Sequence, residues 1–294
     1  MGKSKVLVIG STGMLGSAVV ERLTLVNIET RQASRTVGTR FDAEHDSCED
    51  LLASAGLGPG DYIVNCVGLT KTHIREAEPT SVERAARLNI LFPVALGSAA
   101  AKIGVRVIQI ATDCVFSGAS GQYSESSHHD SYDLYGKSKS MGEVSSENFM
   151  HLRCSLVGPE LDGRNSLFFE WVRQLKTGAV VQGYRNHQWN GLTSETFGSI
   201  VAGIINSGFF FPGVQHLVPA DSVTKADLIK IELALLCRED VKVLDTLATP
   251  GVDRTLSTDN AKRNEELFRL GGFHRIPTIR EMMEALPWSE LRDG

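Results

Sequence analysis

The sequence predicts an α/β protein with a doubly wound parallel sheet and a smaller, helix-rich lobe in its C-terminal part. Val6–Ile9 form a short apolar run with β-branched bias, which is typical of a strand buried on both faces. Three glycines follow at three-residue spacing, and an amphipathic stretch from Leu15 to Leu25 then predicts a helix. Further apolar runs alternate with helical stretches, which favours a parallel sheet covered by helices on both faces.

A strand, a glycine turn and a helix in this order are the fingerprint of a Rossmann-type, dinucleotide-binding fold. Gly10 permits a tight turn, Gly13 lets the backbone approach a pyrophosphate, and Gly16 lets the helix pack closely on the strand. The helix N-terminus presents free N–H groups and the positive end of its dipole to the phosphate. We therefore predict a cofactor site formed by Gly10, Thr12, Gly13, Met14, Leu15 and Gly16.

The composition limits the classes of protein to which the chain can belong. Its 294 residues are 42% hydrophobic and 22% charged, which is ordinary for a globular protein with a large core. The net charge of −5 suggests neither a nucleic-acid nor a membrane partner, and no apolar run reaches the about 20 residues of a membrane-spanning helix. No signal peptide is evident, and the five scattered cysteines lack metal-ligand spacing. We expect reduced thiols, no metal site and a cytoplasmic protein.

The glycine spacing also indicates a family. Gly-x-x-Gly-x-x-Gly with Thr12 before the second glycine resembles the turn of the extended short-chain dehydrogenase/reductase family. This resemblance implies a catalytic Tyr-x-x-x-Lys with a Ser or Thr upstream. Tyr135 and Lys139 are four residues apart, which places them on one helix face, and Thr112 ends the apolar run Val105–Thr112. We predict that these three residues are catalytic and that Tyr135 and Lys139 also contact the cofactor.

The end of the predicted second strand, Ile28–Ser34, bears on the choice of cofactor. An acidic residue here would bind the ribose 2′-hydroxyl of NAD, but the sequence continues with Arg35. A guanidinium forks onto phosphate oxygens, so Arg35 favours NADP(H), although a solvated surface arginine is the alternative. The family often uses an Asp near the adenine, which makes Asp42 a further candidate.

The next predicted strand, Asp61–Val67, ends at the ligand edge of the sheet. Asn65, Cys66 and Val67 are expected beside the nicotinamide ribose, where small residues are needed. The loop from residue 68 to 74 follows this strand at its carboxyl end. Its candidates to face a substrate, each equally open to being a surface polar residue, are Thr70, Lys71 and His73.

A polar residue lies inside the long helix that follows Glu76–Pro79. Asn89 is flanked by apolar neighbours, and a buried Asn needs hydrogen-bond partners. The family places an Asn on this helix to bond a backbone carbonyl and hold a water near the catalytic Lys. The resemblance therefore adds Asn89 to the predicted catalytic residues, with a structural Asn as the alternative.

The second half of the chain shows a looser pattern. We expect strands at His151–Val157, Val214–Val218 and Val241–Leu247, a helix over Asn165–Lys176, and a helix capped by Thr193 that runs to Ile205. A polar and aromatic stretch at 186–193 lies between the two expected helices. We predict an NADP-binding domain over residues 1–158, to which 191–219 return, and a substrate-binding lobe formed by 159–190 and 220–294.

Three segments narrow the resemblance to one branch of the family. Ala111–Gly118, Glu76–Pro79 and Arg254–Ser257 resemble elements of the dTDP-4-dehydrorhamnose reductases. The chain departs from these enzymes at Cys114, at 66–68 and around 186–190, which leaves the reaction class intact and puts the sugar in doubt. The resemblance implies NADPH-dependent reduction of a 4-keto-deoxysugar nucleotide in deoxysugar and polysaccharide precursor synthesis, and it leaves a homodimer open.

In the implied mechanism Tyr135 supplies a proton to the ketone oxygen while the cofactor supplies the hydride. We expect the Lys139 ammonium and the oxidised nicotinamide to lower the tyrosine pKa from its usual value near 10. Thr112 would donate a hydrogen bond to the carbonyl oxygen, and Lys139 would hold the nicotinamide ribose hydroxyls.

Other functions stay open on the same fold. A sugar-nucleotide dehydratase carries Thr-Asp-Glu where this chain has Cys114, and a thiol cannot do the same acid work. An epimerase holds NAD tightly, and Arg35 argues against this function because it favours NADP(H). A non-enzymatic NADP-binding regulatory subunit is the third alternative, as in the β subunit of methionine adenosyltransferase, which resembles the same reductases.

A nucleotide sugar also needs groups that bind its diphosphate. Arginine fits phosphate geometry best, and the second-lobe candidates are Arg164, Arg185 and Arg254, with Arg254 ranked first because of its family-like element. Asp113 follows Thr112 and is expected to face the substrate. Trp189 offers an aromatic face to the sugar or base, with packing between lobes as an equal alternative.

Overall fold

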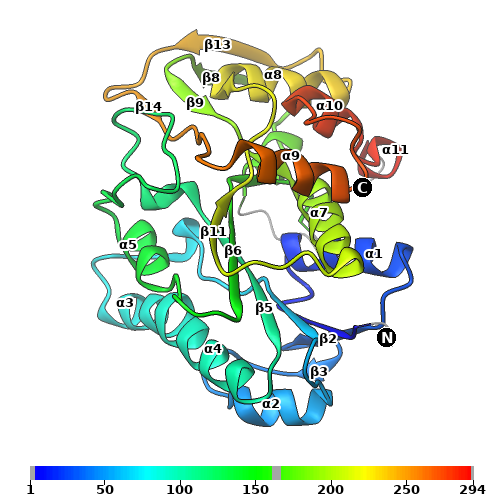
Figure 1. The fold of residues 1–294 in the computed structure, drawn as a ribbon. Helices are drawn as coiled ribbons and strands as arrows, with labels where there is room; N and C mark the ends of the chain where they lie inside the picture. Colours follow the sequence, from blue (N-terminus) through cyan, green and yellow to red (C-terminus); the bar gives the residue numbers. More distant parts are fainter. Residues whose placement is uncertain (1–3, 161–166, 293–294) are drawn as a thin grey trace.

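The computed structural model describes residues 4–160 and 167–292, and a parallel sheet of seven strands forms its centre (Figure 1). The strand order is β11-β6-β5-β4-β1-β2-β3, and every neighbouring pair is parallel. The strands are β1 (Val6–Ile9), β2 (Thr30–Ser34), β3 (Thr39–Arg40), β4 (Tyr62–Asn65), β5 (Arg106–Ala111), β6 (Phe149–Arg153) and β11 (Gly213–His216). The predicted α/β fold with a doubly wound parallel sheet is confirmed.

Helices cover both faces of this sheet (Figure 1). One layer contains α1 (Met14–Leu25), α7 (Ser194–Ser207) and α9 (Ala261–Leu270), and the other contains α2 (Cys48–Ala55) and α4 (Phe92–Lys102). Strand β1 shows why its sequence is continuously apolar. Val6 and Val8 pack toward α1 and α7, Leu7 and Ile9 pack toward α2 and α4, and all four are at most 1% exposed.

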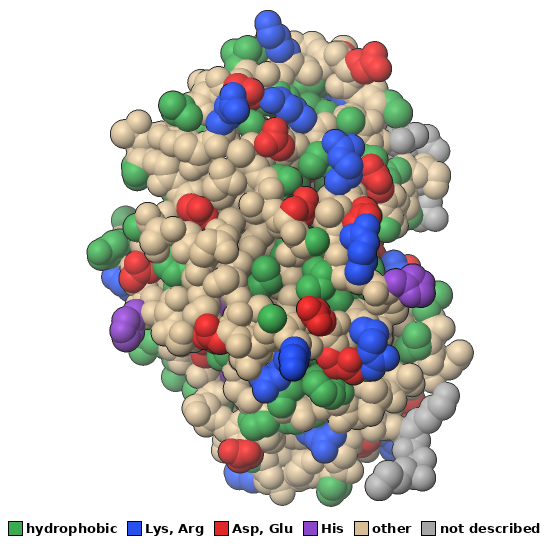
Figure 2. Space-filling view, turned by 45° about the horizontal axis from the view of Figure 1, so that its top comes forward, with side chains coloured by type: hydrophobic (Ala, Val, Ile, Leu, Met, Phe, Trp, Pro, Cys, Tyr) green, Lys and Arg blue, Asp and Glu red, His purple; other side chains and the backbone are tan. Residues whose placement is uncertain are grey.

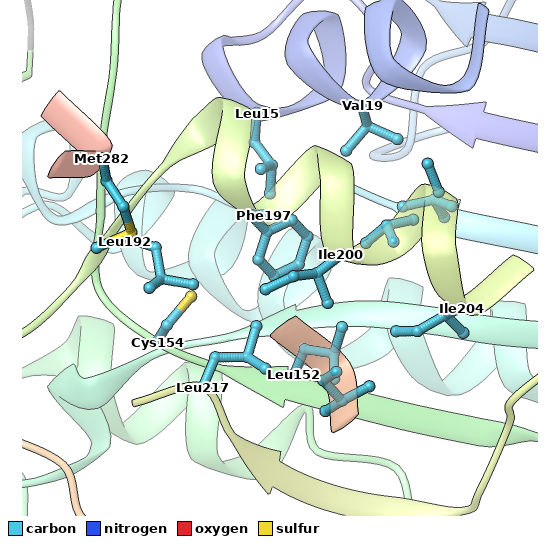
Figure 3. Packing of buried hydrophobic residues seen from close by; sticks show 14 of the residues in the cluster. Leu15, Val19, Leu152, Cys154, Leu192, Phe197, Ile200, Ile204, Leu217 and Met282 are labelled. Carbon is cyan, nitrogen blue, oxygen red and sulfur yellow. The ribbon is translucent and has the colours of Figure 1, made fainter. Parts of the chain in front are cut away.

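The α1–α7 pair builds the larger part of the core. Figure 3 shows Leu15 and Val19 of α1 facing Phe197 and Ile200 of α7, and all four belong to one buried cluster. Thr193 caps α7 as predicted, accepting a hydrogen bond from the Thr196 N–H, and the helix ends two residues later than expected.

The remaining elements lie outside the large sheet. The small sheets contain β7 (Leu156–Val157) with β10 (Leu192–Thr193), β8 (Val180–Tyr184) with β13 (Lys242–Thr246), and β9 (His187–Trp189) with β12 (Val223–Thr224) and β14 (Val252–Asp253). The other helices are α3 (Pro79–Ala86), α5 (Leu134–Met141), α6 (Phe168–Arg173), α8 (Lys225–Leu235), α10 (Ile279–Glu284) and α11 (Trp288–Arg292). The short helical turns are η1 (Lys71–His73), the π-helical η2 (Arg87–Leu91) and η3 (Asp113–Val115).

Most expected elements differ from the structure by one or two residues at their ends, and two differ more. The strand expected at His151–Val157 is split, because the chain leaves the large sheet after Arg153 and Leu156–Val157 pair with β10. Ser155 lies at this break, where its Oγ accepts the Trp189 indole N–H and its carbonyl accepts the Leu192 N–H. Of the helix expected over Asn165–Lys176, Phe168–Arg173 are helical, and residues 165 and 166 lie outside the described residues.

The segments assigned to the two lobes are only partly separated in space, because α9, which lies within 220–294, packs on α7 in the layer over the large sheet. Residues 191–219 contribute α7 and β11 to the layers of the large sheet, whereas β8, β9, β13 and α8 form the smaller body at the opposite end (Figure 1). The division of the chain into two lobes stays a prediction.

The surface carries charges of both signs. Figure 2 shows Lys and Arg side chains interspersed with Asp and Glu on the face that it displays. Over residues 4–160 and 167–292, no helix is both long and apolar enough to cross a membrane.

Phe197→Ala tests the α1–α7 packing. The ring is 1% exposed, so truncation should lower the free energy of unfolding by about 3–5 kcal/mol through lost burial and the cavity left behind. Chemical denaturation followed by circular dichroism measures this change. Val37→Ala at a side chain 46% exposed is the control and should stay within about 0.5 kcal/mol, and equal effects would contradict the assignment of this core.

Candidate active site

The candidate site lies where the strand order of the large sheet reverses. Strand β2 lies on one side of β1 and β4 on the other, so the connections after these strands leave in opposite directions. Open parallel sheets bind ligands at this point, outside the carboxyl ends of the strands. The glycine turn follows β1, and Asn65 ends β4.

The glycine turn leaves its centre open. Gly10 has a φ of +79°, and a Cβ on Gly16 would lie 2.1 Å from the Gly10 carbonyl oxygen, so both positions require glycine. A Cβ on Gly13, by contrast, would meet nothing closer than 3.5 Å. Gly13 is the N-cap of α1 without a side-chain cap, and the first turn holds no acidic residue. The free end of α1 therefore suits an anion.

The other residues of this turn take different roles. The Leu15 side chain packs into the core, so only its backbone can face a ligand. The Ser11 hydroxyl is buried and has no hydrogen-bond partner among the described residues. A buried polar atom normally has a partner, so a ligand that supplies one fits here.

Two arginines stand at the ends of β2 and β3. The Ser34 hydroxyl turns inward and accepts the Val37 N–H at 2.7 Å, while Arg35 is exposed. The parallel register pairs Ser34 with Arg40, which is also exposed. In the described part of the chain neither arginine forms an ion pair. Asp42, the third candidate at this end, uses a carboxylate oxygen to accept the Glu44 N–H at 3.0 Å.

Asn65 shapes the chain after β4. The side chain is fully buried, accepts the Val67 N–H at 3.0 Å and donates to the Gln109 side chain on β5 at 2.9 Å. It thereby fixes the turn that contains Cys66 and Val67 at the sheet edge. Burial raises the pKa of the Cys66 thiol to about 12, so this sulfur is neutral.

Asn89 joins this loop to helix α5. Its Oδ1 accepts the Leu69 N–H at 2.8 Å, and its Nδ2 donates to the Leu69 carbonyl and to the Ser138 hydroxyl, both at 3.0 Å. It lies in the π-helical turn η2, a distortion that is frequent at functional sites. The geometry makes Asn89 a positioning residue, because it holds a loop against the helix that carries Lys139.

The structure brings the predicted catalytic trio together. Thr112 directly follows β5, and its hydroxyl accepts the Cys114 N–H at 3.2 Å and donates to Asp113 at 3.3 Å. It also lies close enough to the Tyr135 phenol to favour the ionised form of that group. Lys139 lies one turn further along α5 and donates from Nζ to the Ile110 carbonyl at 3.2 Å. The hydroxyl, the phenol and the ammonium therefore converge at the carboxyl end of β5, the strand next to β4.

Burial determines the protonation of this trio. It raises the pKa of Tyr135 above its ordinary value, with only a partial offset from the nearby Thr112 side chain. It lowers the pKa of Lys139 to about 8. From the sequence we expect Lys139 to lower the tyrosine pKa, but these surroundings raise it. The free energy lost when a phenolate is removed from water exceeds the stabilisation that the neighbouring groups give it. At neutral pH the phenol is protonated and most of the Lys139 amine is charged.

The residues predicted to face a substrate from the loop after β4 contact each other or α5. Lys71 donates to Asp133 at 2.7 Å, and Asp133 caps α5 by accepting the Gly136 N–H. Thr70 and His73 are hydrogen-bonded at 2.9 Å. The Lys71–Asp133 and Asp133–Gly136 bonds hold the N-terminal end of the helix that carries Tyr135.

Two cations from the second half of the chain face Asp113. This carboxyl is 8% exposed, and burial raises its pKa although Arg254 and Lys225 lie nearby. Arg254 donates from Nε to the Phe116 carbonyl at 2.8 Å, which anchors it beside η3. Lys225 lies 4.5 Å from the ring centre of Phe168. Sequence reasoning missed Lys225, since nothing in the local sequence connects the start of α8 with the end of β5.

The other second-lobe candidates lie in different surroundings. Trp189 is 5% exposed and donates from its indole to the Ser155 hydroxyl at 2.8 Å, which is the environment of a packing residue. The Arg185 side chain is 66% exposed and faces Asp245 at 4.0 Å. Arg164 lies outside the described residues.

Comparisons with known proteins place the chain among proteins of known families and folds. The family model described as RmlD substrate binding domain matches residues 4–180. Methionine adenosyltransferase 2 subunit beta from Mus musculus is 32% identical over 148 residues, which cover 47% of this chain and 41% of that protein. The matched stretch thus spans about two fifths of the curated relative.

Solved structures share the fold over nearly the whole chain. A dTDP-4-dehydrorhamnose reductase from Clostridium acetobutylicum has a TM-score of 0.77 at 20% identity and covers 99% of this chain and 100% of its own. The dTDP-4-dehydrorhamnose reductase from Bacillus anthracis in complex with NADP has the same TM-score and identity, with 96% and 98% covered.

Proposed function

The chain belongs to the RmlD substrate binding domain family, and on this premise we propose that it uses NADPH to reduce a 4-keto-deoxysugar nucleotide. One observation carries the proposal. The Tyr135 phenol lies near Thr112 with Lys139 one turn further on, at the same edge of the sheet as an open glycine turn. A protonated acid, a hydrogen-bond donor and a cation at one sheet edge are the groups that carbonyl reduction needs.

The glycine turn fits a nicotinamide dinucleotide. Its unblocked Gly13, its uncapped helix N-terminus and the unpaired Ser11 hydroxyl suit a pyrophosphate. Arg35 and Arg40 suit a 2′-phosphate, and the Bacillus anthracis reductase that shares the fold is in complex with NADP. When bound, the cofactor supplies the hydride.

The side chains of this protein then perform the proton chemistry. Tyr135, kept protonated by burial, donates its proton to the substrate oxygen. Thr112 donates a hydrogen bond to the same oxygen as negative charge develops there. Lys139 holds the ribose hydroxyls and compensates the tyrosinate that remains. Arg254 and Lys225, the two cations near Asp113, suit the diphosphate of a nucleotide sugar.

Residues of the same site bear on the alternative functions. A dehydratase mechanism needs a second acid or base beside Thr112, but burial raises the pKa of Cys114 to about 12 and keeps it neutral. Against an epimerase, which holds NAD tightly, stands the exposed Arg35 at the end of β2, because a guanidinium suits the 2′-phosphate of NADP(H). The similarity to methionine adenosyltransferase 2 subunit beta favours a non-enzymatic regulatory role as the second candidate. NADPH consumption with a panel of 4-keto-deoxysugar nucleotides separates them. Binding of NADPH without turnover of any sugar would favour the regulatory role.

Arg35→Ala tests the cofactor preference. Loss of a charge-assisted contact to the 2′-phosphate removes about 1.5–3 kcal/mol, so the KM for NADPH should rise roughly ten- to a hundredfold. The KM for NADH should change little, and steady-state kinetics with both cofactors measures this. Arg269→Ala, at an exposed arginine on α9, is the control. A wild-type protein that prefers NADH would contradict the assignment.

Tyr135→Phe tests proton donation. Only the hydroxyl is lost, so NADPH should still bind while kcat falls by about 10²–10⁴-fold, the usual contribution of general acid catalysis. Tyr132→Phe on the same segment is the matched control. Tyr132 is 84% exposed, so its substitution should leave kcat unchanged. Near-normal turnover of the folded Tyr135 variant would assign the proton to another group.

Arg254→Ala tests the site of the diphosphate. Calorimetry with dTDP-glucose should show roughly ten- to a hundredfold weaker binding, because a charge-assisted contact of about 1.5–3 kcal/mol is lost, while NADPH affinity is kept. Arg185→Ala is the control within the second lobe. Unchanged dTDP-glucose affinity, or an equal loss for both ligands, would reject this placement.

A further inference from the structure

A fully buried arginine lies close to the catalytic helix. Arg153, the last residue of β6, is 1% exposed. Its Nη2 donates to both carboxylate oxygens of Glu143 at 2.5 and 2.6 Å. A buried guanidinium is costly unless it is paired and hydrogen-bonded. In the described part of the chain Glu143 is the one carboxylate that forms an ion pair with Arg153.

Two histidines bond the Nη atoms of Arg153 without adding charge, while its Nε has no hydrogen-bond partner among the described residues. His129 Nε2 accepts from Nη2 at 2.9 Å, and His216 Nε2 accepts from Nη1 at 2.8 Å. A guanidinium only donates, so each imidazole carries its proton on Nδ1, facing the Ser140 hydroxyl in His129 and the Ser257 carbonyl in His216. Both rings are therefore neutral, and burial lowers the pKa of each. Arg153 is thereby oriented toward Glu143.

Glu143 stands at the C-terminal end of the catalytic helix. It follows Gly142, the C-cap of α5, and lies four residues beyond Lys139. A Cβ on Gly142 would lie 1.8 Å from the Asn89 carbonyl oxygen, so this end of α5 abuts η2. The Glu143–Arg153 pair fastens that end to β6, as Asp133 caps the other end.

The environment of Lys139 contains few charges. Its Nζ bonds the Ile110 carbonyl of β5, and it would lie 3.8 Å from a Cβ on Gly68. The titratable groups that face it are Tyr135 on α5, His151 on β6 and Glu143 beyond the helix end. Burial lowers the pKa of His151, which keeps that ring neutral, so the Glu143 carboxylate is the group that favours the charged ammonium.

We propose that Glu143, held by Arg153 just beyond the end of α5, is a positioning residue that keeps Lys139 charged. The inference rests on the proposed function and deepens it, because it explains how a buried lysine stays cationic one helical turn from the catalytic phenol. Arg153 acts one step further away by fixing the Glu143 carboxylate.

The test is a titration of Lys139 that does not depend on turnover. Protein labelled with ¹³C at lysine Cε is titrated by NMR without ligands, and the Lys139 signal is assigned by its loss in Lys139→Met. The wild-type midpoint is expected near pH 8. Glu143→Gln should lower it by about one pH unit, because one nearby negative charge is lost in a poorly solvated site. Glu147→Gln, at an exposed glutamate four residues further on, should not move it.

A conservative variant keeps the proposal testable if Glu143→Gln does not fold. Glu143→Asp retains the charge but withdraws it by one methylene, and its midpoint should fall between the wild type and the Gln variant. An unchanged midpoint in a folded Gln or Asp variant, or an equal shift in Glu147→Gln, would overturn the proposal.

Activity provides the second measurement. In the proposed reaction kcat/KM for NADPH should fall as pH rises through about 8, because Lys139 loses its charge there, and this limb should move down with the NMR midpoint in Glu143→Gln. If the fall of kcat/KM stays at the same pH while the NMR midpoint of Lys139 moves, the role of Glu143 in the reaction would be overturned. Failure of the proposed function would show separately, as absence of turnover in the wild type.

Discussion

The close approach of Gly16 to the Gly10 carbonyl is the constraint on which the fold and the site both depend. Any side chain at Gly16 would collide with that oxygen, so α1 begins directly over the carboxyl end of β1. This contact puts the N-terminus of α1 at the point where the strand order reverses. The same helix carries the face on which α7 packs, and Gly198 of α7 lets the two backbones come close. One close contact therefore places both the anion site and the larger core.

The catalytic helix α5 is held by polar contacts at both ends. Asp133 and Glu76 accept N–H groups at its start, and Glu143 bonds Arg153 just beyond its end. Acidic groups near the start satisfy unpaired N–H groups and suit the helix dipole. An eight-residue helix with little intrinsic stability is thereby kept in register against β5. Because Tyr135 and Lys139 both lie on it, their spacing from Thr112 depends on these anchors.

Those parts of the fold and site that are encoded locally could be predicted from the sequence. Val6–Ile9 are apolar on both faces because both faces are buried, and the glycine spacing reflects contacts within a few residues. The Tyr135–Lys139 pair follows from helical spacing alone. Arg40, Lys225 and the Glu143–Arg153 pair could not be found in this way. Arg40 acquires its place from parallel register with β2, and Lys225 from the position of a helix far along the chain.

The pKa values of Tyr135 and Lys139 could not be predicted from the sequence either. From the sequence, a lysine four residues from a tyrosine suggests a lowered tyrosine pKa, since the two groups share a helix face. The structure adds burial, which disfavours the charged form of both and thus raises one pKa and lowers the other. For a reductase this is the favourable arrangement, because the phenol must still hold its proton when the substrate arrives. Burial of this kind depends on the packing of α5, η2 and β5 together, so the proton chemistry of the site is a property of the tertiary fold.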